Sequence, residues 1–249
     1  MLRTVYILWL RELKKFVRKP SRIVGALGQP LLYLLALGYG LGSVFTAAGQ
    51  GNYVRFLVPG MLGMTLVFTS VFNGMQIIWD RQFGFLKETL VAPVPRTAIM
   101  IGRTLGGASV ATTQACIVFV LTLSLGFQPV TWPAVIPALM IMLLIATLFS
   151  AFGITVASLF TDMQGFQLVM NFVVMPLFFL SGALFPLGEV PFLLNLLAAL
   201  DPLSYGVDGL RGLLTDTSQF SVPTDVAVLS AIAAVVLALG SYRFTKLEV

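Results

Sequence analysis

Histidine is absent from this sequence of 249 residues, and cysteine occurs once, at Cys116. Without histidine, the chain lacks the commonest general base, proton carrier and metal ligand of proteins. A single cysteine excludes a disulfide within the chain, and a metal site would need ligands that the sequence does not offer. These two scarcities argue against a metal centre and against histidine-dependent catalysis.

Charged residues are also scarce, because they make up 10% of the chain whereas hydrophobic residues make up 58%. None falls in the middle of a long apolar run, where an ion-coupled transporter usually keeps one, and the two halves show no evident repeat. No Gly-Lys dipeptide occurs, so the chain has no Walker-A loop. An embedded hydrolase would lack a base for its nucleophile. These absences predict a membrane path that is not itself an enzyme.

The long apolar runs decide the fold class. With a mean hydropathy of +0.96, a chain of this size cannot hide its apolar surface in a soluble domain. A helix needs about 20 apolar residues to cross the hydrocarbon core. The runs therefore predict an all-α integral membrane domain over residues 1–249, with a kink at Pro176. Six transmembrane helices are expected at 24–45, 56–79, 105–125, 134–160, 166–185 and 226–242.

The first 22 residues combine apolar and basic side chains at helical spacing. Val5, Leu8 and Phe16 fall on one side, and most of the Lys and Arg residues fall on the other. This pattern predicts an amphipathic interfacial helix over 1–22, with Trp9 at the level of the lipid head groups.

The segment 80–103 is an island of charge between two apolar runs. Its charged residues are Asp80, Arg81, Lys87, Glu88, Arg96 and Arg103. The apolar residues between Gln82 and Ala92 are spaced for a short helix with one apolar face, which ends before Pro93 and Pro95. Such a helix in water needs a partner, so the segment is expected to dock another protein.

A second unusual segment, 186–225, lies between the fifth and sixth spans. Between Glu189 and Asp201 only 11 uncharged residues occur, too few to cross a membrane and too apolar for open water. A re-entrant or interfacial helix is expected there, followed by a short helix. That second helix holds Asp208 and Arg211 at a spacing that predicts an ion pair within an external cap.

The basic residues predict the orientation. With six spans, 13 of the 15 Lys and Arg residues fall on the side of both termini and the segment 80–103, leaving Arg55 and Arg211 on the other. The positive-inside rule places the first side in the cytoplasm. Attraction to anionic membrane lipid explains the net charge of +5, so no nucleic-acid partner is expected.

The island resembles the cytoplasmic loop in permease subunits of ABC type-2 exporters. The family pattern is roughly Arg-x-x-Gly-x-x-x-Glu-x-Leu-x-x-x-Pro, followed by Gly-Lys/Arg. Its positions fall here on Arg81, Gly84, Glu88, Leu90, Pro95 or Pro93, and Gly102-Arg103. The stretch from Leu180 to Leu214 is similar to a second signature of the family, and one departure is Gln82, where an acid often stands.

The resemblance implies a dimer, expected to be a homodimer, of two six-helix subunits around a central path in a bacterial or archaeal cell membrane. Each subunit would dock a separate nucleotide-binding subunit, an ATPase, through a cytoplasmic coupling helix between the second and third spans. ATP and Mg would belong to that partner, and no cofactor to this chain. The implied coupling residues are Arg81, Phe83, Gly84, Phe85, Leu86, Lys87, Glu88 and Thr89.

The same resemblance implies that the second and fifth spans line the path. The implied lining residues are Phe68, Phe72, Asn73, Phe178 and Phe179. An apolar, aromatic lining favours a hydrophobic or amphipathic substrate such as a drug, a lipid or a lipid-linked glycan. Helix packing or lipid contact is the alternative for each phenylalanine, and Asn73 and Asn171 are expected to form interhelical hydrogen bonds.

Two further interpretations stay open. The glycines at Gly38 and Gly42 indicate either a face for close helix approach or a loosened helix end. A membrane pore, or a structural or assembly membrane protein without an ATPase partner, would also lack catalytic groups. A pore would need a continuous polar stripe, which no span shows, and an assembly protein would leave the predicted docking helix without a purpose.

Overall fold

The computed structural model describes residues 1–47, 51–85, 94–187 and 191–245, and every regular element in these ranges is a helix. Six helical stretches are long and apolar enough to cross a membrane. The predicted fold class, an all-α membrane protein with six spans, is therefore confirmed. The elements are α1 (Leu2–Val17), α2 (Pro20–Gly40), α3 (Gly42–Ala47), α4 (Tyr53–Gln82), α6 (Arg96–Ser124), α7 (Val135–Leu159), α8 (Met163–Val169), η1 (Met170–Val174), α9 (Met175–Leu180), α10 (Phe192–Leu200), α11 (Pro202–Thr215) and α12 (Val222–Thr245).

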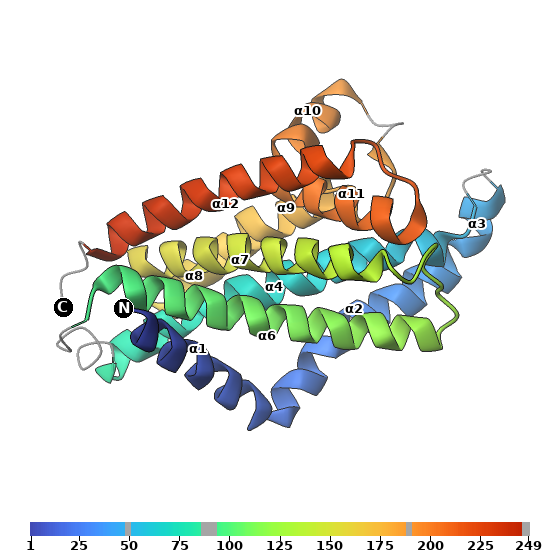
Figure 1. The fold of residues 1–249 in the computed structure, drawn as a ribbon. Coiled ribbons are helices and arrows are strands. Elements are labelled where there is room, and N and C mark those ends of the chain that lie inside the picture. The colour runs from blue at the N-terminus through green and yellow to red at the C-terminus, as the bar shows by residue number, and fades with distance from the viewer. Residues whose placement is uncertain (48–50, 86–93, 188–190, 246–249) are drawn as a thin grey trace.

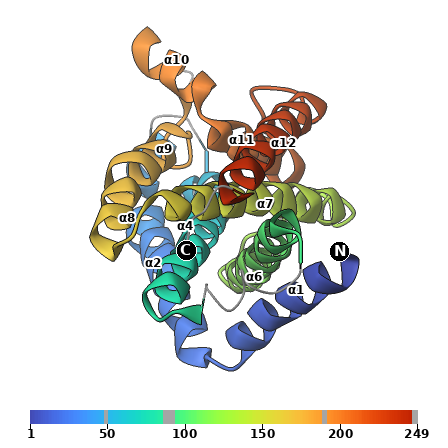
Figure 2. The ribbon, with the colours of Figure 1, turned by 90° about the vertical axis from the view of Figure 1, so that its left-hand side faces the viewer.

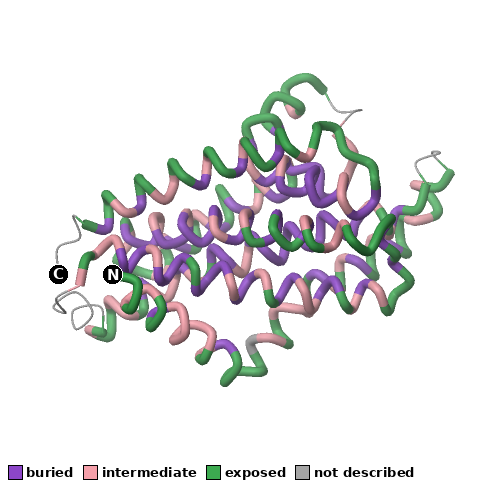
Figure 3. Tube along the Cα trace, in the orientation of Figure 1, coloured by how far each residue is buried: buried purple, intermediate pink, exposed green. Residues whose placement is uncertain are grey.

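The long helices run side by side along one axis, and both termini lie at the same end of the bundle (Figure 1). The buried residues concentrate in α4, α6, α7 and α11 (Figure 3). α4 and α7 approach closely because glycines meet at their crossing: a Cβ on Gly74 would overlap the backbone of Gly153. Small residues allow such backbone contact between membrane helices.

The outer spans bury little of their surface within this chain. Of the apolar stretch of α4 that could cross the membrane, 72% is buried within this chain. The buried share of the corresponding stretch is 17% in α2, 17% in α12 and 22% in Met163–Leu180. The end view shows these helices at the periphery, with α10 projecting from the bundle (Figure 2). Their exposed apolar faces therefore need lipid or another protein chain around them.

Two helix boundaries differ from the predicted spans 56–79 and 105–125. α4 continues to Gln82, and α6 begins at Arg96, so both helices extend into the charged island. A helix can carry Arg103 past the end of the apolar run because an acid on the neighbouring helix neutralises its charge. The connection between the two helices is therefore shorter than the predicted loop 80–103.

Other boundaries shift less. The expected first span, 24–45, is divided into α2 and α3, and Gly38 packs against Val54 whereas Gly42 has no described atom within 4 Å of a Cβ position. The fifth span contains the π-helix η1 directly before Pro176, which lies in the first turn of α9. Proline has no backbone N–H, so a wide turn before it relieves the lost hydrogen bond.

The N-terminal helix α1 packs along the first half of α6, as both ribbon views show (Figures 1 and 2). Trp9 Nε1 donates a hydrogen bond to Ser109 Oγ at 2.9 Å. A Cβ on Gly102 would touch Leu8 and Val5, so glycine is needed for this close approach. α1 is thus anchored to the third span, and its predicted position at the membrane surface stays a prediction.

Candidate functional site

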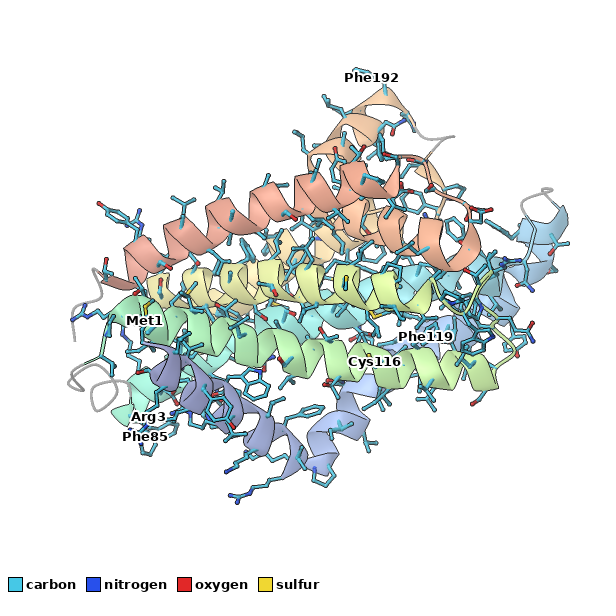
Figure 4. All side chains as sticks on the ribbon, viewed as in Figure 1. Met1, Arg3, Phe85, Cys116, Phe119 and Phe192 are labelled. Carbon is cyan, nitrogen blue, oxygen red and sulfur yellow. The ribbon has the colours of Figure 1, made fainter. Side chains whose placement is uncertain are left out.

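The end of the bundle that holds both termini also holds the start of the predicted coupling segment. Phe85 lies at this end of the bundle (Figure 4). α4 ends at Gln82, and Gly84 adopts a φ of +79°, the left-handed conformation with which glycine commonly ends a helix. The side chains of Phe83 and Phe85 are 63% and 57% exposed. Two aromatic side chains of the predicted coupling set therefore lie on the surface.

Of the remaining charged and apolar members of that set, the structure describes only Arg81. Arg81 Nη1 donates a hydrogen bond to the carbonyl oxygen of Phe160, 3.3 Å away, at the C-terminal end of α7. A cation is favourable at a helix C-terminus, so Arg81 ties α4 to α7. The other predicted residues lie outside the described residues: Leu86, Lys87, Glu88 and Thr89.

A cluster of charges, which we call the basal ionic cluster, joins α1, α4 and α6 just inside this end. Its centre is Asp80, whose Oδ2 lies 2.5 Å from Arg103 Nη2 and 3.5 Å from Arg11 Nη2. Glu12 Oε1 pairs with Arg11 and Lys15, each at 3.3 Å. The Arg103 side chain is 4% exposed and that of Asp80 is 15% exposed, so water screens their interaction little.

Sequence reasoning missed the basal ionic cluster: it placed Asp80 and Arg103 in the charged island, and Arg11 and Lys15 on the basic side of the N-terminal helix. A signal was present, because Glu12 and Asp80 each occur next to basic residues at a predicted membrane boundary. What the sequence does not show is that α1 turns back onto α6 and brings the two acids together.

A cavity of about 520 Å³ opens mainly between α2 and α4. Its residues are apolar and aromatic with several amides, hydroxyls and one lysine: Lys19, Gly25, Ala26, Gln29, Pro30, Met64, Thr65, Phe68, Thr69, Phe72, Met75, Gln76, Trp79 and Gln114. The mixture suits a molecule with apolar and polar parts, and its volume is in the range of small-ligand pockets. The amide residues of this wall were not predicted.

The predicted path residues do not all meet in this cavity. Phe68 and Phe72 line it. Phe178 is only 1% exposed and packs edge-on against Phe68, with ring centroids 6.0 Å apart, so it is a packing residue within this chain. Phe179 is 45% exposed on the outside of α9.

The two asparagines behave differently. Asn73 Nδ2 donates to the carbonyl oxygen of Gly107 on α6 at 3.3 Å, which confirms the predicted interhelical hydrogen bond. Asn171 accepts instead from Gln167 Nε2 of its own span, at 3.5 Å. The prediction for Asn171 was wrong because its side chain lies on the exposed face of η1.

The predicted ion pair between Asp208 and Arg211 is not formed, although the structure describes both residues. The Asp208 carboxylate accepts backbone hydrogen bonds of 2.8–3.1 Å from Gln219 and Phe220. Arg211 Nη2 donates to the carbonyl oxygen of Gly182 at 3.0 Å, and its guanidinium lies 4.0 Å from the centre of the Phe56 ring. The spacing of Asp208 and Arg211 correctly indicated one face of a helix. The chain after α11 folds back, however, and its backbone N–H groups take up the hydrogen-bonding capacity of the carboxylate.

Asp201 caps the N-terminus of α11, with Oδ1 accepting from the Leu203 N–H at 2.8 Å. Burial raises the pKa of its carboxyl from 3.8 to about 7, because the charged form loses water, and the hydrogen bonds from Leu203 and Ser204 only partly offset this. Sequence reasoning used Asp201 only as the boundary of the uncharged stretch that follows Glu189.

Comparison with known proteins identifies the chain. A family described as ABC-2 type transporter matches residues 3–215. The chain belongs to the ABC-2 type transporter family. It is 31% identical over 214 residues to the transport permease ycf38 of Porphyra purpurea, covering 80% of this chain and 70% of that protein. It is 27% identical over 196 residues to nodulation protein J of Rhizobium leguminosarum bv. trifolii, covering 78% and 74%.

As an ABC-2 permease, this chain is a multi-pass membrane protein of an ABC transporter system, in which an ATPase is the partner. The resemblance predicted from the charged island and from Leu180 to Leu214 is confirmed. Relatives named as permeases agree with the prediction that the chain is a transport subunit and not itself an enzyme.

Proposed function

We propose that this chain is the transmembrane subunit of an ATP-driven exporter and docks its ATPase through the segment that follows α4. The observation that carries the proposal is the exposure of Phe83 and Phe85, which directly follow α4. Phe85 lies at the end of the bundle that holds both termini (Figure 4). The basal ionic cluster and Arg81 hold the helices behind this surface. A push on the segment would therefore move α1, α4, α6 and α7 together as a rigid body.

The orientation in this proposal has both termini in the cytoplasm. It is supported by the 13 of 15 Lys and Arg residues on the predicted cytoplasmic side. The basic face of α1 then meets anionic lipid at that surface. We place the protein in the cell membrane of a bacterium or archaeon, as the bacterial relatives named nodulation protein J suggest.

The substrate is hydrophobic or amphipathic. The cavity between α2 and α4 supports this, because Phe68, Phe72 and Trp79 offer apolar contact while Gln29 and Gln114 offer hydrogen bonds. A drug, a lipid or a lipid-linked glycan fits such a lining better than a bare sugar chain does. ATP and Mg bind to the ATPase subunit.

The functional unit contains a second permease subunit, and we propose a homodimer. Support comes from the exposed apolar faces of α2 and of the stretch Met163–Leu180. Only 17% and 22% of these two membrane-crossing stretches are buried within this chain. A second copy would cover these faces and close the open side of the cavity, with lipid around the rest.

The proposed function is tested by purifying the tagged full-length chain from its host in mild detergent. We expect an ATPase subunit to copurify in about equal amount, and Phe85→Ala to reduce that amount. Phe192→Ala is the matched control, because Phe192 is 83% exposed on α10. If no ATPase copurifies with the parent chain, the docking proposal is wrong and a pore or an assembly protein becomes the better account.

A further inference from the structure

A second pocket, of about 480 Å³, lies at the end of the bundle opposite the termini, where α3, the start of α4 and the end of α11 meet (Figure 1). We call it the distal pocket. Its residues are Phe45, Gly51, Asn52, Arg55, Phe56, Pro186, Arg211, Thr215, Thr217, Ser218 and Gln219. Two arginines thus face a pocket that also has aromatic walls and several hydroxyl groups.

Arg211 is the buried cation of the distal pocket. The residue is 8% exposed, and its Nε has no hydrogen-bond partner among the described residues. Burial lowers the pKa of Arg211 to about 10, and the field of Asp208 partly offsets this, so the guanidinium stays charged at neutral pH. A buried cation with a donor to spare is costly unless an anion approaches it.

No described carboxylate forms an ion pair with either arginine. Asp208, the acid that interacts with Arg211, directs its oxygens at the backbone of Gln219 and Phe220. Arg55 is exposed, and it lines both the distal pocket and a neighbouring pocket of about 400 Å³. An incoming anion can therefore contact one exposed and one buried arginine.

The apolar wall indicates what carries the anion. Phe45 and Phe56 pack together with ring centroids 5.4 Å apart, and Pro186 lines the same pocket. An inorganic anion gains nothing from these rings, whereas an alkyl or isoprenoid chain gains burial. Arginine is suited to phosphate, sulfate or carboxylate oxygens because its planar guanidinium can donate two parallel hydrogen bonds.

We propose that the distal pocket binds the oxyanion head group of an amphipathic molecule, with Arg55 and Arg211 as its ligands. This inference rests on the proposed function, in which the pocket lies on the outer face and receives the exported substrate. The two arginines are the residues that the positive-inside rule leaves on that side, and the pocket gives them a role in recognition.

The test uses the full-length chain in discs of phosphatidylcholine and isothermal titration calorimetry, with empty discs subtracted. The probes are hexyl phosphate, uncharged hexyl glucoside and inorganic phosphate. We expect saturable binding of hexyl phosphate and binding of the other two at least about tenfold weaker, the loss of one good contact. Equal binding of hexyl glucoside, or no saturable binding of hexyl phosphate, would overturn the site. Equal binding of inorganic phosphate would overturn the assignment to an amphipathic molecule.

Two variants locate the binding. Arg55→Gln changes an exposed residue and is expected to weaken hexyl phosphate binding up to about fivefold. Arg211→Lys keeps the charge, loses the planar pair of donors and is expected to weaken binding about tenfold. Arg18→Gln makes the same charge change as Arg55→Gln on an exposed residue that does not line the distal pocket, and it should have no effect. An equal loss in all three would mean general attraction, and the proposal would fail.

Glu189 lies outside the described residues and is tested directly. If Glu189→Gln strengthens hexyl phosphate binding more than about tenfold, that acid already neutralises the arginines and the pocket is an ion pair, not a binding site. Binding within about twofold of the parent supports the proposal. None of these measurements involves the ATPase, so a failed copurification with intact binding would overturn the docking proposal alone.

Discussion

Asp80 and Arg103 join the last turn of α4 to the first half of α6, with Oδ2 and Nη2 2.5 Å apart. These two residues bracket the segment through which we propose that the ATPase acts. The pair therefore fixes both ends of the segment to one another, and a force on it reaches two membrane helices at once.

The first prediction concerns this pair. Removing one partner leaves a nearly buried charge, so Asp80→Asn and Arg103→Gln should each lower the free energy of unfolding by about 2–4 kcal/mol. The double variant Asp80→Asn/Arg103→Gln should lose about 1–3 kcal/mol less than the sum of the two. Thermal unfolding of the three variants in the same detergent measures the coupling.

Arg18→Gln is the control for this cycle, because Arg18 is exposed and forms no ion pair that the structure describes. It should change stability by less than about 0.5 kcal/mol. Strict additivity of Asp80→Asn and Arg103→Gln would show that the pair contributes nothing to the fold.

The second prediction concerns the crossing of α4 and α7. A Cβ on Gly74 would overlap the backbone of Gly153, which cannot move without separating the helices. Gly74→Ala should therefore cost about 1–3 kcal/mol. Gly28→Ala, within α2, meets no described atom and should be neutral or stabilising by up to about 1 kcal/mol. The same unfolding temperature for both variants would contradict the crossing.

The third prediction concerns pH. Because burial raises the pKa of Asp201 above its unfolded value, its protonated form stabilises the fold below pH 3.8, and this contribution is lost as pH rises through about 7. Stability should fall over this interval, by up to about 1.4 kcal/mol per pH unit from this group.

The variant Asp201→Asn keeps a capping oxygen and has no charge to lose, so it should flatten the fall of the unfolding temperature between pH 5 and pH 7. Asp216→Asn is the control, because Asp216 is exposed and its left-handed φ of 57° suits asparagine. Equal slopes for Asp201→Asn and the parent would mean that Asp201 is charged throughout this range.

Much of the fold followed from the sequence, because membrane spans are set by length and hydropathy within a single run of residues. The fourth span, predicted at 134–160, corresponds closely to α7. The misplaced start of α6 has a long-range cause: Arg103 remains helical because Asp80, 23 residues earlier, neutralises it. Composition alone cannot reveal such a partner.

The candidate site was predicted less well for the same reason. The spacing of Asp208 and Arg211 indicates one helix face, but Gln219 and Phe220 fold back onto the carboxylate. Phe178 was expected to line the path because the fifth span, which contains it, was expected to line the path. Its orientation toward Phe68 depends on the packing of two helices. Local patterns predict the elements, and contacts between elements decide the roles of these side chains.

The central claim is that the ATPase docks beside Phe85, and site-specific photocross-linking tests it most directly. A photoreactive amino acid is placed at position 85 or at position 192 of the full-length chain in host membranes, since both side chains are exposed but lie far apart (Figure 4). The account predicts that the ATPase subunit cross-links to position 85 and not to position 192. Absence of the ATPase from the products at position 85, or equal cross-linking at both positions, would contradict it.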